Sequence, residues 1–330
     1  MIGKWLRSAA LSLTLAAGLG GAAQAEDLKE LNFGIISTES SQNLKKVWDP
    51  FLADMSKKLG MKVNAFFAPD YAGVIEAMRF DKVDVAWHGN KSAMEAVDRA
   101  NGEIFVQTVA ADGSPGYWSL LIAHKDNAKL NSVEDVIKHG KELTFSNGDP
   151  NSTSGYLVPG YYVFGLNKID PKTYFKQTVS ANHESNALAV ANGQVDFATN
   201  NTENMAKIEK NFPDKFKELK VIWKSPLIPS DPIVWRKNLT DGDKAKIKEF
   251  FMTYGNTPEE KSVLAGLQWG QFKDSNDNQL IPIRILAQFK NRIAVESDTT
   301  LSDGDRQAKL AEIDAKLAEL KEKEKAVATN

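Results

Sequence analysis

Three consecutive hydroxyl side chains near the middle of the chain could hold an anion. Ser152, Thr153 and Ser154 lie between a short apolar segment, 143–145, and an aromatic-rich run, 156–164. This order predicts a strand, a turn and a helix start, where unpaired N–H groups and the positive end of the helix dipole favour negative charge. An ordinary helix N-cap would need only one of the hydroxyls. Both interpretations, an N-cap and an anion site, stay open from these residues alone.

A histidine and a tyrosine stand at two other predicted helix starts. His183 follows Asn182, and its imidazole could donate a hydrogen bond when neutral or add positive charge when protonated. Tyr71 follows Asp70, and its hydroxyl could reach an anion from a different element. The plain alternatives are a solvent-facing or capping histidine and a core or rim tyrosine.

Two carboxylates and a second tyrosine lie at predicted strand ends and crossings. Glu203 comes just past a predicted strand, Asp231 precedes Pro232, and Tyr117 begins another strand. Two carboxylates in one cleft repel each other unless a cation joins them. The tyrosine could add a hydrogen bond or an aromatic face for that cation. Alternatively, Glu203 caps a helix and Asp231 is a turn residue before proline.

Short apolar runs alternate with helical patterns along most of the chain. Such βαβ alternation predicts an α/β protein with mostly parallel sheets. A further strand, 232–235, is expected to return to the first half of the fold. The predicted strands are 31–37, 62–68, 83–87, 117–125 and 143–146, and the predicted helices are 42–59, 71–80, 133–140, 241–254 and 258–266.

A faint internal repeat indicates two lobes with equivalent strands. Residues 83–86 read Val-Asp-Val-Ala, and residues 195–198 read Val-Asp-Phe-Ala. Each follows a helical pattern and ends in polar residues, 88–90 and 199–201. Ligands of open α/β sheets bind beyond the carboxyl ends of strands, so we expect both polar ends to face one cleft.

The first 25 residues read as a secretory signal peptide, with a basic start, an apolar stretch and cleavage after Ala25. The mature chain would then be exported with a net charge of about −4, which argues against a nucleic-acid partner. The sequence contains no cysteine, so disulfides, thiol catalysis and cysteine-based zinc sites are excluded.

Four segments, 31–39, 68–73, 111–118 and 148–155, resemble the periplasmic phosphonate-binding proteins of ABC transporters. The similarity spans nearly the whole mature chain and is greatest to enterobacterial members that prefer 2-aminoethylphosphonate. It implies a two-lobed class II periplasmic binding protein that closes by hinge motion. The expected limits are 26–118 with 231–300 for lobe 1, 119–230 for lobe 2, and 301–330 for a C-terminal helix and tail.

The resemblance also implies roles and partners. The protein would bind 2-aminoethylphosphonate or a similar alkylphosphonate in the periplasm, with high affinity and without a cofactor or metal, and deliver it to a membrane permease with its ATPase. The phosphonate end would be bound by Ser152, Thr153, Ser154, His183 and Tyr71, and the amine end by Glu203, Asp231 and Tyr117. One departure from the family pattern is His88, where an aromatic Tyr is expected. It concerns the cleft wall near Gly89 and Asn90 rather than the anion site.

Three other classes of protein compete with this interpretation. An enzyme is disfavoured because the sequence lacks a Gly-x-Ser-x-Gly elbow, a phosphate-binding P-loop and a clustered His/Asp metal set. Phosphonate cleavage calls for a metal, a cofactor or a covalent nucleophile. A binding protein for phosphate, phosphite or a sulfonate would not explain the two carboxylates. A purely structural envelope protein does not suit the two-lobed pattern.

Near the C-terminus, apolar residues recur every three or four positions among Lys, Glu and Ala. This spacing predicts an amphipathic helix with a narrow apolar seam. The seam could pack on its own chain or form a homodimer contact, and the sequence favours neither. Its members are Leu310, Ile313, Leu317 and Leu320.

Overall fold

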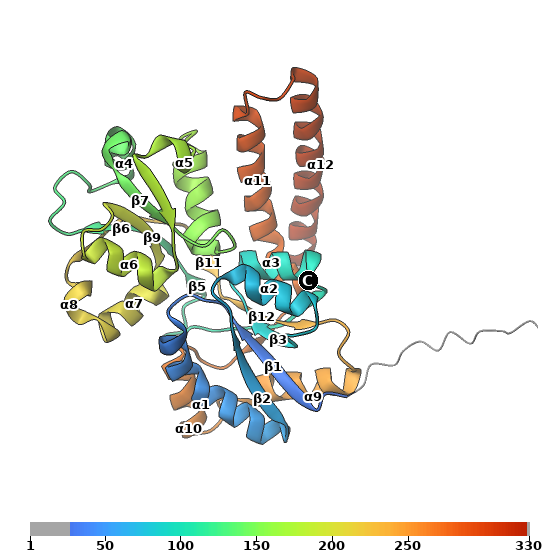
Figure 1. Ribbon diagram of the computed structural model, residues 1–330. Coiled ribbons are helices and arrows are strands. Elements are labelled where there is room, and N and C mark those ends of the chain that lie inside the picture. The colour runs from blue at the N-terminus through green and yellow to red at the C-terminus, as the bar shows by residue number, and fades with distance from the viewer. Residues whose placement is uncertain (1–26, 329–330) are drawn as a thin grey trace, which may run out of the picture.

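Two sheets form two lobes, and a helical hairpin rises beside them (Figure 1). The computed structural model describes residues 27–328, and the predicted signal peptide with its cleavage after Ala25 lies outside them. The lobe 1 sheet has the order β13 (Lys273–Asp274), β4 (Gly102–Gln107), β12 (Pro232–Arg236), β3 (Val85–Trp87), β1 (Glu30–Ile35), β2 (Lys62–Phe67). The lobe 2 sheet has the order β10 (Leu219–Lys224), β6 (Ser119–His124), β9 (Phe197–Asn201), β7 (Thr144–Asn147), β8 (Gln177–Ser180). We propose the limits predicted above for the two lobes.

Both sheets are mixed, so the prediction of mostly parallel sheets is wrong. Strands β1, β2 and β3 pair in parallel, but β12 pairs antiparallel with both β3 and β4. In lobe 2, β6 likewise pairs antiparallel with β9 and β10. The reason is the chain path: β6 and β12 each enter their sheet from the other lobe and run in the reverse direction. The predicted return of residues 232–235 to lobe 1 is confirmed.

Helices pack against both sheets, and their apolar faces supply the two main cores. In α1, for example, Trp48, Phe51 and Met55 are buried. The lobe 1 helices are α1 (Ser41–Leu59), α2 (Tyr71–Arg79), α3 (Asn90–Arg99), α9 (Asp241–Thr253) and α10 (Pro258–Gly266). The lobe 2 helices are α4 (Val133–His139), α5 (Pro171–Tyr174), α6 (His183–Ala191), α7 (Thr202–Asn211) and α8 (Pro213–Phe216).

The two aspartates of the internal repeat occupy equivalent places in the two lobes. Asp84 Oδ2 accepts a hydrogen bond from the Asn32 amide of β1 at 2.7 Å. Asp196 Oδ2 accepts one from the Thr144 amide of β7, also at 2.7 Å. In each lobe the aspartate precedes a strand that runs parallel to the strand it bonds, β3 beside β1 and β9 beside β7. The expectation of equivalent strands is confirmed.

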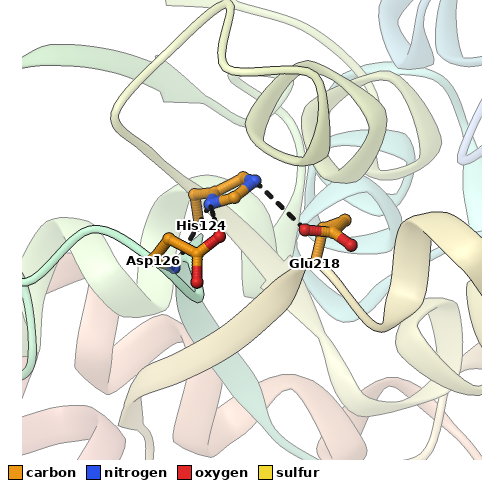
Figure 2. A group of neighbouring side chains, drawn as sticks. All are labelled: His124, Asp126 and Glu218. Carbon is orange, nitrogen blue, oxygen red and sulfur yellow. Dashed lines mark hydrogen bonds and ion pairs between the residues drawn. The ribbon is translucent and has the colours of Figure 1, made fainter.

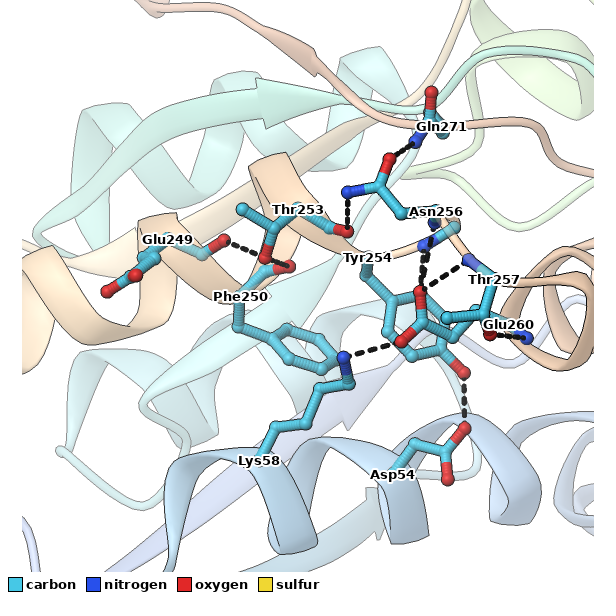
Figure 3. Close-up of polar contacts among 11 residues, drawn as sticks. Asp54, Lys58, Glu249, Phe250, Thr253, Tyr254, Asn256, Thr257, Glu260 and Gln271 are labelled. Atoms are coloured by element: carbon cyan, nitrogen blue, oxygen red, sulfur yellow. Dashed lines mark hydrogen bonds and ion pairs between the residues drawn. The ribbon is translucent and has the colours of Figure 1, made fainter.

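A buried carboxylate joins three helices on the outer side of lobe 1 (Figure 3). Glu260 lies 2.5 Å from the Lys58 ammonium of α1 and accepts 2.9 Å hydrogen bonds from the amides of Gly255 and Asn256. These contacts, the Lys58 hydrogen bond foremost, lower the pKa of Glu260 to about 2. Glu260 also completes a capping box at the start of α10, so the carboxylate stabilises the α9–α10 turn against α1.

The chain passes between the lobes at a short antiparallel pair of strands, β5 (Gly116–Tyr117) and β11 (Ile228–Pro229). A Cβ atom on Gly116 would lie 1.9 Å from the Ile228 carbonyl oxygen, so only glycine fits this close approach. A third connection is α11 (Ile281–Ser297). It packs on α3 in lobe 1 and on the π-helical segment η3 (Gly160–Gly165) in lobe 2.

The last helix, α12 (Asp303–Ala328), packs side by side with α11 (Figure 1). Leu317 and Leu320 of its apolar seam are buried, whereas Leu310 and Ile313 are partly exposed. The seam therefore packs on its own chain at least in part. Within residues 27–328, no helix combines the length and apolar character needed to cross a membrane.

Candidate functional site

All the residues predicted to bind ligand line one small cavity between the lobes. Its free volume is about 40 Å³, several times what one water needs (about 10–15 Å³), so the space suits a small polar molecule. The predicted residues that line it are Tyr71, Tyr117, Ser152, Thr153, Ser154, His183, Glu203 and Asp231.

The three hydroxyl oxygens of the turn all accept hydrogen bonds from the protein. Ser152 Oγ caps the helix start by accepting from the Gly155 amide at 2.9 Å. Thr153 Oγ1 accepts from the Lys91 amide of lobe 1 at 2.8 Å, and Ser154 Oγ accepts from Asn201 Nδ2 at 3.1 Å. The N-cap interpretation thus holds for Ser152 alone. Because the oxygens are used as acceptors, the hydroxyl protons can be donated to an anion.

The segment after Ser152 is a π-helical turn, η2 (Thr153–Leu157), rather than the expected ordinary helix start. Within residues 27–328 we find no acceptor for the backbone amides of Thr153 and Ser154. Gly155 allows the turn to close, because a Cβ there would lie 2.9 Å from Ser152 Oγ and 3.1 Å from the Gly148 Cα. The turn therefore offers amide donors as well as hydroxyls.

His183 stands behind two of the hydroxyls. Its Nε2 lies 3.4 Å from Ser152 Oγ and 3.5 Å from Ser154 Oγ. Burial, together with the nearby positive charge of Lys207, lowers the pKa of His183 to about 4. The imidazole is therefore neutral near pH 7 and contributes hydrogen bonds rather than charge.

Tyr71 approaches the turn from lobe 1, as the first residue of α2. Its amide donates to Asp149 Oδ2 of lobe 2 at 3.1 Å, and its side chain is buried in the cleft. Burial, and then the negative charges of Asp149 and Asp231, raise the pKa of Tyr71. The phenol consequently stays protonated and keeps its donor.

Asp231 and Glu203 line the same cavity. Both oxygens of Asp231 accept hydrogen bonds, Oδ1 from the Tyr117 hydroxyl at 2.9 Å and Oδ2 from the Trp87 indole at 3.2 Å. The Glu203 carboxylate receives no hydrogen bond from the part of the chain that the structure describes. Burial raises the pKa of both acids, and the charge of Glu203 raises that of Asp231 further. Such a pair favours a bound cation.

A sequence profile of the periplasmic substrate-binding proteins of phosphonate ABC transporters matches residues 33–280. The chain belongs to this family. A phosphonates-binding periplasmic protein of Escherichia coli is 65% identical over 295 residues, which cover 89% of this chain and 87% of that protein. A phosphate-import protein of Mycolicibacterium smegmatis is 33% identical over 72% of this chain and 76% of its own length.

A solved structure agrees with the family assignment. The binding-protein component of a phosphonate ABC transporter from Pseudomonas aeruginosa superposes with a TM-score of 0.89 at 61% identity, covering 92% of this chain and all of that one. The protein is therefore the periplasmic solute-binding component of a phosphonate ABC transporter, which implies a small-molecule ligand and membrane partners. The matched relatives are transport proteins rather than enzymes.

Several cavity residues of this binding protein were missed by the sequence analysis. Trp87 orients Asp231, and its position one residue before His88 at a strand end could have indicated it. Thr38 Oγ1, Gln268 Oε1 and both side-chain polar atoms of Asn204 are buried without a partner in residues 27–328. The position of Asn204 directly after Glu203 was a usable signal, whereas nothing in the sequence around Thr38 or Gln268 indicates the cleft. Two charged residues, Glu39 and Lys207, also line the cavity.

The polar end of β3 only partly faces the cleft. Gly89 lines the cavity, but His88 and Asn90 do not. Asn90 donates instead to the Pro229 carbonyl at 2.8 Å. His88 is fully buried, and neither ring nitrogen has a hydrogen-bond partner in the described part of the chain. Burial lowers the pKa of His88 to about 3, so this residue is a neutral part of the lobe 1 interior. The same holds at the end of β9, where Asn201 lines the cavity but Thr199 and Asn200 do not, because they hydrogen-bond within lobe 2.

A second polar group lies on the surface of lobe 2 (Figure 2). His124 Nδ1 is 3.9 Å from Asp126, and Nε2 is 3.5 Å from Glu218. The two carboxylates face opposite nitrogens of one ring, and Lys125 pairs with Glu218 at 3.1 Å. We interpret the group as a surface polar cluster, because Lys125 already pairs with Glu218 and His124 Nδ1 accepts a hydrogen bond from the Asp126 backbone amide at 3.2 Å.

Proposed function

We propose that the protein binds 2-aminoethylphosphonate, or a similar aminoalkylphosphonate, with high affinity in the interlobe cleft. One observation carries the proposal. One small cavity is lined by the Ser152–Thr153–Ser154 donors, which we take as its donor end, and by the unpaired Glu203 carboxylate with Asp231, which we take as its acidic end. The ligand would then pass to a membrane permease with its ATPase.

The donor end suits a phosphonate group. Its acceptor oxygens would receive hydroxyls from three consecutive residues, the free amides of Thr153 and Ser154, and the Tyr71 phenol. No described arginine lines the cavity, and Lys207, which does, is paired with Glu39, so binding would depend on converging neutral donors and the helix start.

The acidic end suits an ammonium group. Its three N–H donors could reach both Glu203 and Asp231, while Tyr117 and Trp87 hold Asp231 in place. Phosphate, phosphite or methylphosphonate would fill only the donor end and leave two carboxylates without a cation. Unpaired buried charges cost several kcal/mol, so these ligands would bind more weakly.

The main alternative is a binding protein for a simpler oxyanion. The name of the Mycolicibacterium smegmatis relative, a phosphate-import protein, supports it. For this chain the free carboxylate of Glu203 disfavours that alternative, because a simple oxyanion would leave it without a cation. An enzyme that processes phosphonates or phosphate is a weaker alternative, since the matched relatives are transport proteins.

Titration calorimetry tests the proposal with matched ligands. We expect 2-aminoethylphosphonate to bind most tightly, followed by methylphosphonate and phosphate. 2-Aminoethanesulfonate keeps the amine but carries less negative charge, and we expect it to bind weakly. Thermal unfolding should show the same order, because a ligand of the folded state raises the midpoint. If none of the phosphonates raises the unfolding midpoint, the proposal is contradicted. Recovery of chemically unchanged ligand after incubation would distinguish binding from catalysis.

A homodimer through α12 is a proposal that rests on the partly exposed seam residues Leu310 and Ile313. Light scattering on the mature chain tests it. A mass of two chains would support the dimer, and a mass of one chain across the micromolar range would exclude it.

A further inference from the structure

A buried ion pair joins the two lobes next to the acidic end of the cavity. Lys207 Nζ of α7, in lobe 2, lies 2.5 Å from Glu39 Oε1, which follows β1 in lobe 1. The Glu39 side chain is 3% exposed and that of Lys207 19%. Because the partners belong to different lobes, this pair requires the lobes to be in contact, as they also are at Tyr71–Asp149 and Lys91–Thr153; we call this arrangement closed.

Lys207 has a second carboxylate within reach on its own helix. Glu203 stands four residues before it on α7, and a Glu followed by a Lys at this spacing is the favourable order for a helical ion pair. The Lys207 charge acts on Glu203 even in the closed form, where it opposes the effect of burial on the pKa of Glu203. When the lobes separate and Glu39 moves away, Glu203 is the acid that α7 itself keeps beside Lys207.

We propose that Lys207 is a specificity-determining residue that changes partner on closure. In the open protein it neutralises Glu203. In the closed protein it pairs with Glu39 and leaves Glu203 for the ammonium group of the ligand. This inference rests on the proposed function, since it explains how recognition of an aminoalkylphosphonate drives closure.

The charge balance of the closed cavity favours a ligand with an amine. With such a ligand, Lys207 pairs with Glu39 and the ammonium pairs with Glu203. Without the amine, Lys207 can pair with only one of Glu39 and Glu203, and the other stays unpaired in the cleft, which is unfavourable. Other contacts between the lobes lack this dependence. Asn43 Nδ2, for example, donates to Glu184 Oε2 at 2.6 Å, and neither residue lines the cavity.

The test compares the affinity ratio of 2-aminoethylphosphonate to methylphosphonate by calorimetry in three proteins. In Glu39→Gln, Lys207 has no acid in lobe 1 and stays on Glu203, where it competes with the ligand amine. We expect the ratio to fall about tenfold, because one protein charge replaces the ligand charge. In Glu39→Gln with Lys207→Met, the competitor is gone and the ratio returns to the wild-type value. Lys210→Gln, an exposed change on the same helix, is the control.

Two outcomes would overturn the proposed change of partner. In the first, Glu39→Gln weakens both ligands equally, so that the ion pair only stabilises the closed form. In the second, the double variant has an affinity ratio as low as that of Glu39→Gln alone. Wild-type protein that binds neither phosphonate would overturn the proposed function itself, before any variant is measured. Thermal unfolding shows whether the variants fold. If Glu39→Gln does not fold, Glu39→Ala replaces it, and we expect the same change in the affinity ratio.

Discussion

The Tyr117 hydroxyl donates to Asp231 Oδ1 at 2.9 Å, although the two residues are 114 positions apart in the chain. Tyr117 belongs to β5, and Asp231 follows its partner strand β11. The chain crosses between the lobes at both strands, so the hydrogen bond places a carboxylate at the hinge and inside the cleft. The hinge and the proposed recognition of a cation therefore depend on the same pair of strands.

Replacing Tyr117 with phenylalanine should weaken binding of 2-aminoethylphosphonate. The change removes one of the two donors that hold Asp231, worth about 1–2 kcal/mol or roughly tenfold in affinity. Calorimetry should show a smaller effect on methylphosphonate. The partly exposed Tyr161, which lies outside the cavity, provides the matched control Tyr161→Phe. Equal weakening of both ligands would mean that Tyr117 acts on closure rather than on the amine.

Glu203→Gln should reduce selectivity for the amine. The side chain keeps its shape but loses its charge, which should cost 2-aminoethylphosphonate about 2 kcal/mol, or roughly thirtyfold. Methylphosphonate should bind as well as before or better, since an unpaired negative charge has been removed from the cleft. Glu209→Gln, on the exposed side of α7, should change neither affinity. Calorimetry with equal losses for both ligands would remove Glu203 from the amine site.

Glu260→Gln should destabilise lobe 1 without changing ligand affinity. It removes the charge that Lys58 and the amides of Gly255 and Asn256 stabilise (Figure 3), and we expect a loss of about 2 kcal/mol in the free energy of unfolding. Since the folded pKa of about 2 is below the ordinary 4.5, the wild-type advantage is full above pH 4.5 and disappears as the pH falls towards 2.

Urea denaturation at several pH values measures this difference, with the exposed neighbour Glu259 as control in Glu259→Gln. A pH-independent difference between wild type and Glu260→Gln would mean that the ionised carboxylate is not the stabilising species.

Local patterns were sufficient to predict much of this fold and site. Apolar runs of strand length indicated most strands, and the two Val-Asp repeats indicated equivalent strands because each aspartate bonds within its own lobe. Three consecutive hydroxyls indicated the turn at 152–154, whose residues line the cavity. All of these signals come from short stretches of sequence.

Contacts between distant segments could not be predicted in this way. Glu39 and Lys207 are 168 positions apart, and neither has a local pattern that indicates the other. The sheet direction also depends on where β6 and β12 cross between lobes, which hydrophobic periodicity does not report. The π-helical form of η2 was not predicted either, and the close approach of Gly155 to Gly148 beside it has no periodic signal in the sequence.

The buried His88 should make the protein sensitive to mild acid. Its folded pKa of about 3 lies below the ordinary 6.5, so the unfolded chain binds the proton more readily and stability falls as the pH drops below 6.5. The expected loss from this residue is about 2 kcal/mol between pH 7.5 and pH 5. In His88→Asn, which cannot titrate there, the decline should be shallower by that amount. Urea denaturation across this range measures it, with His139→Asn on α4 as control.

The acids Glu203 and Asp231, whose pKa values are raised, act in the opposite direction but equally in both proteins. Parallel curves for wild type and His88→Asn would therefore show that His88 is protonated, or hydrated, in the folded state.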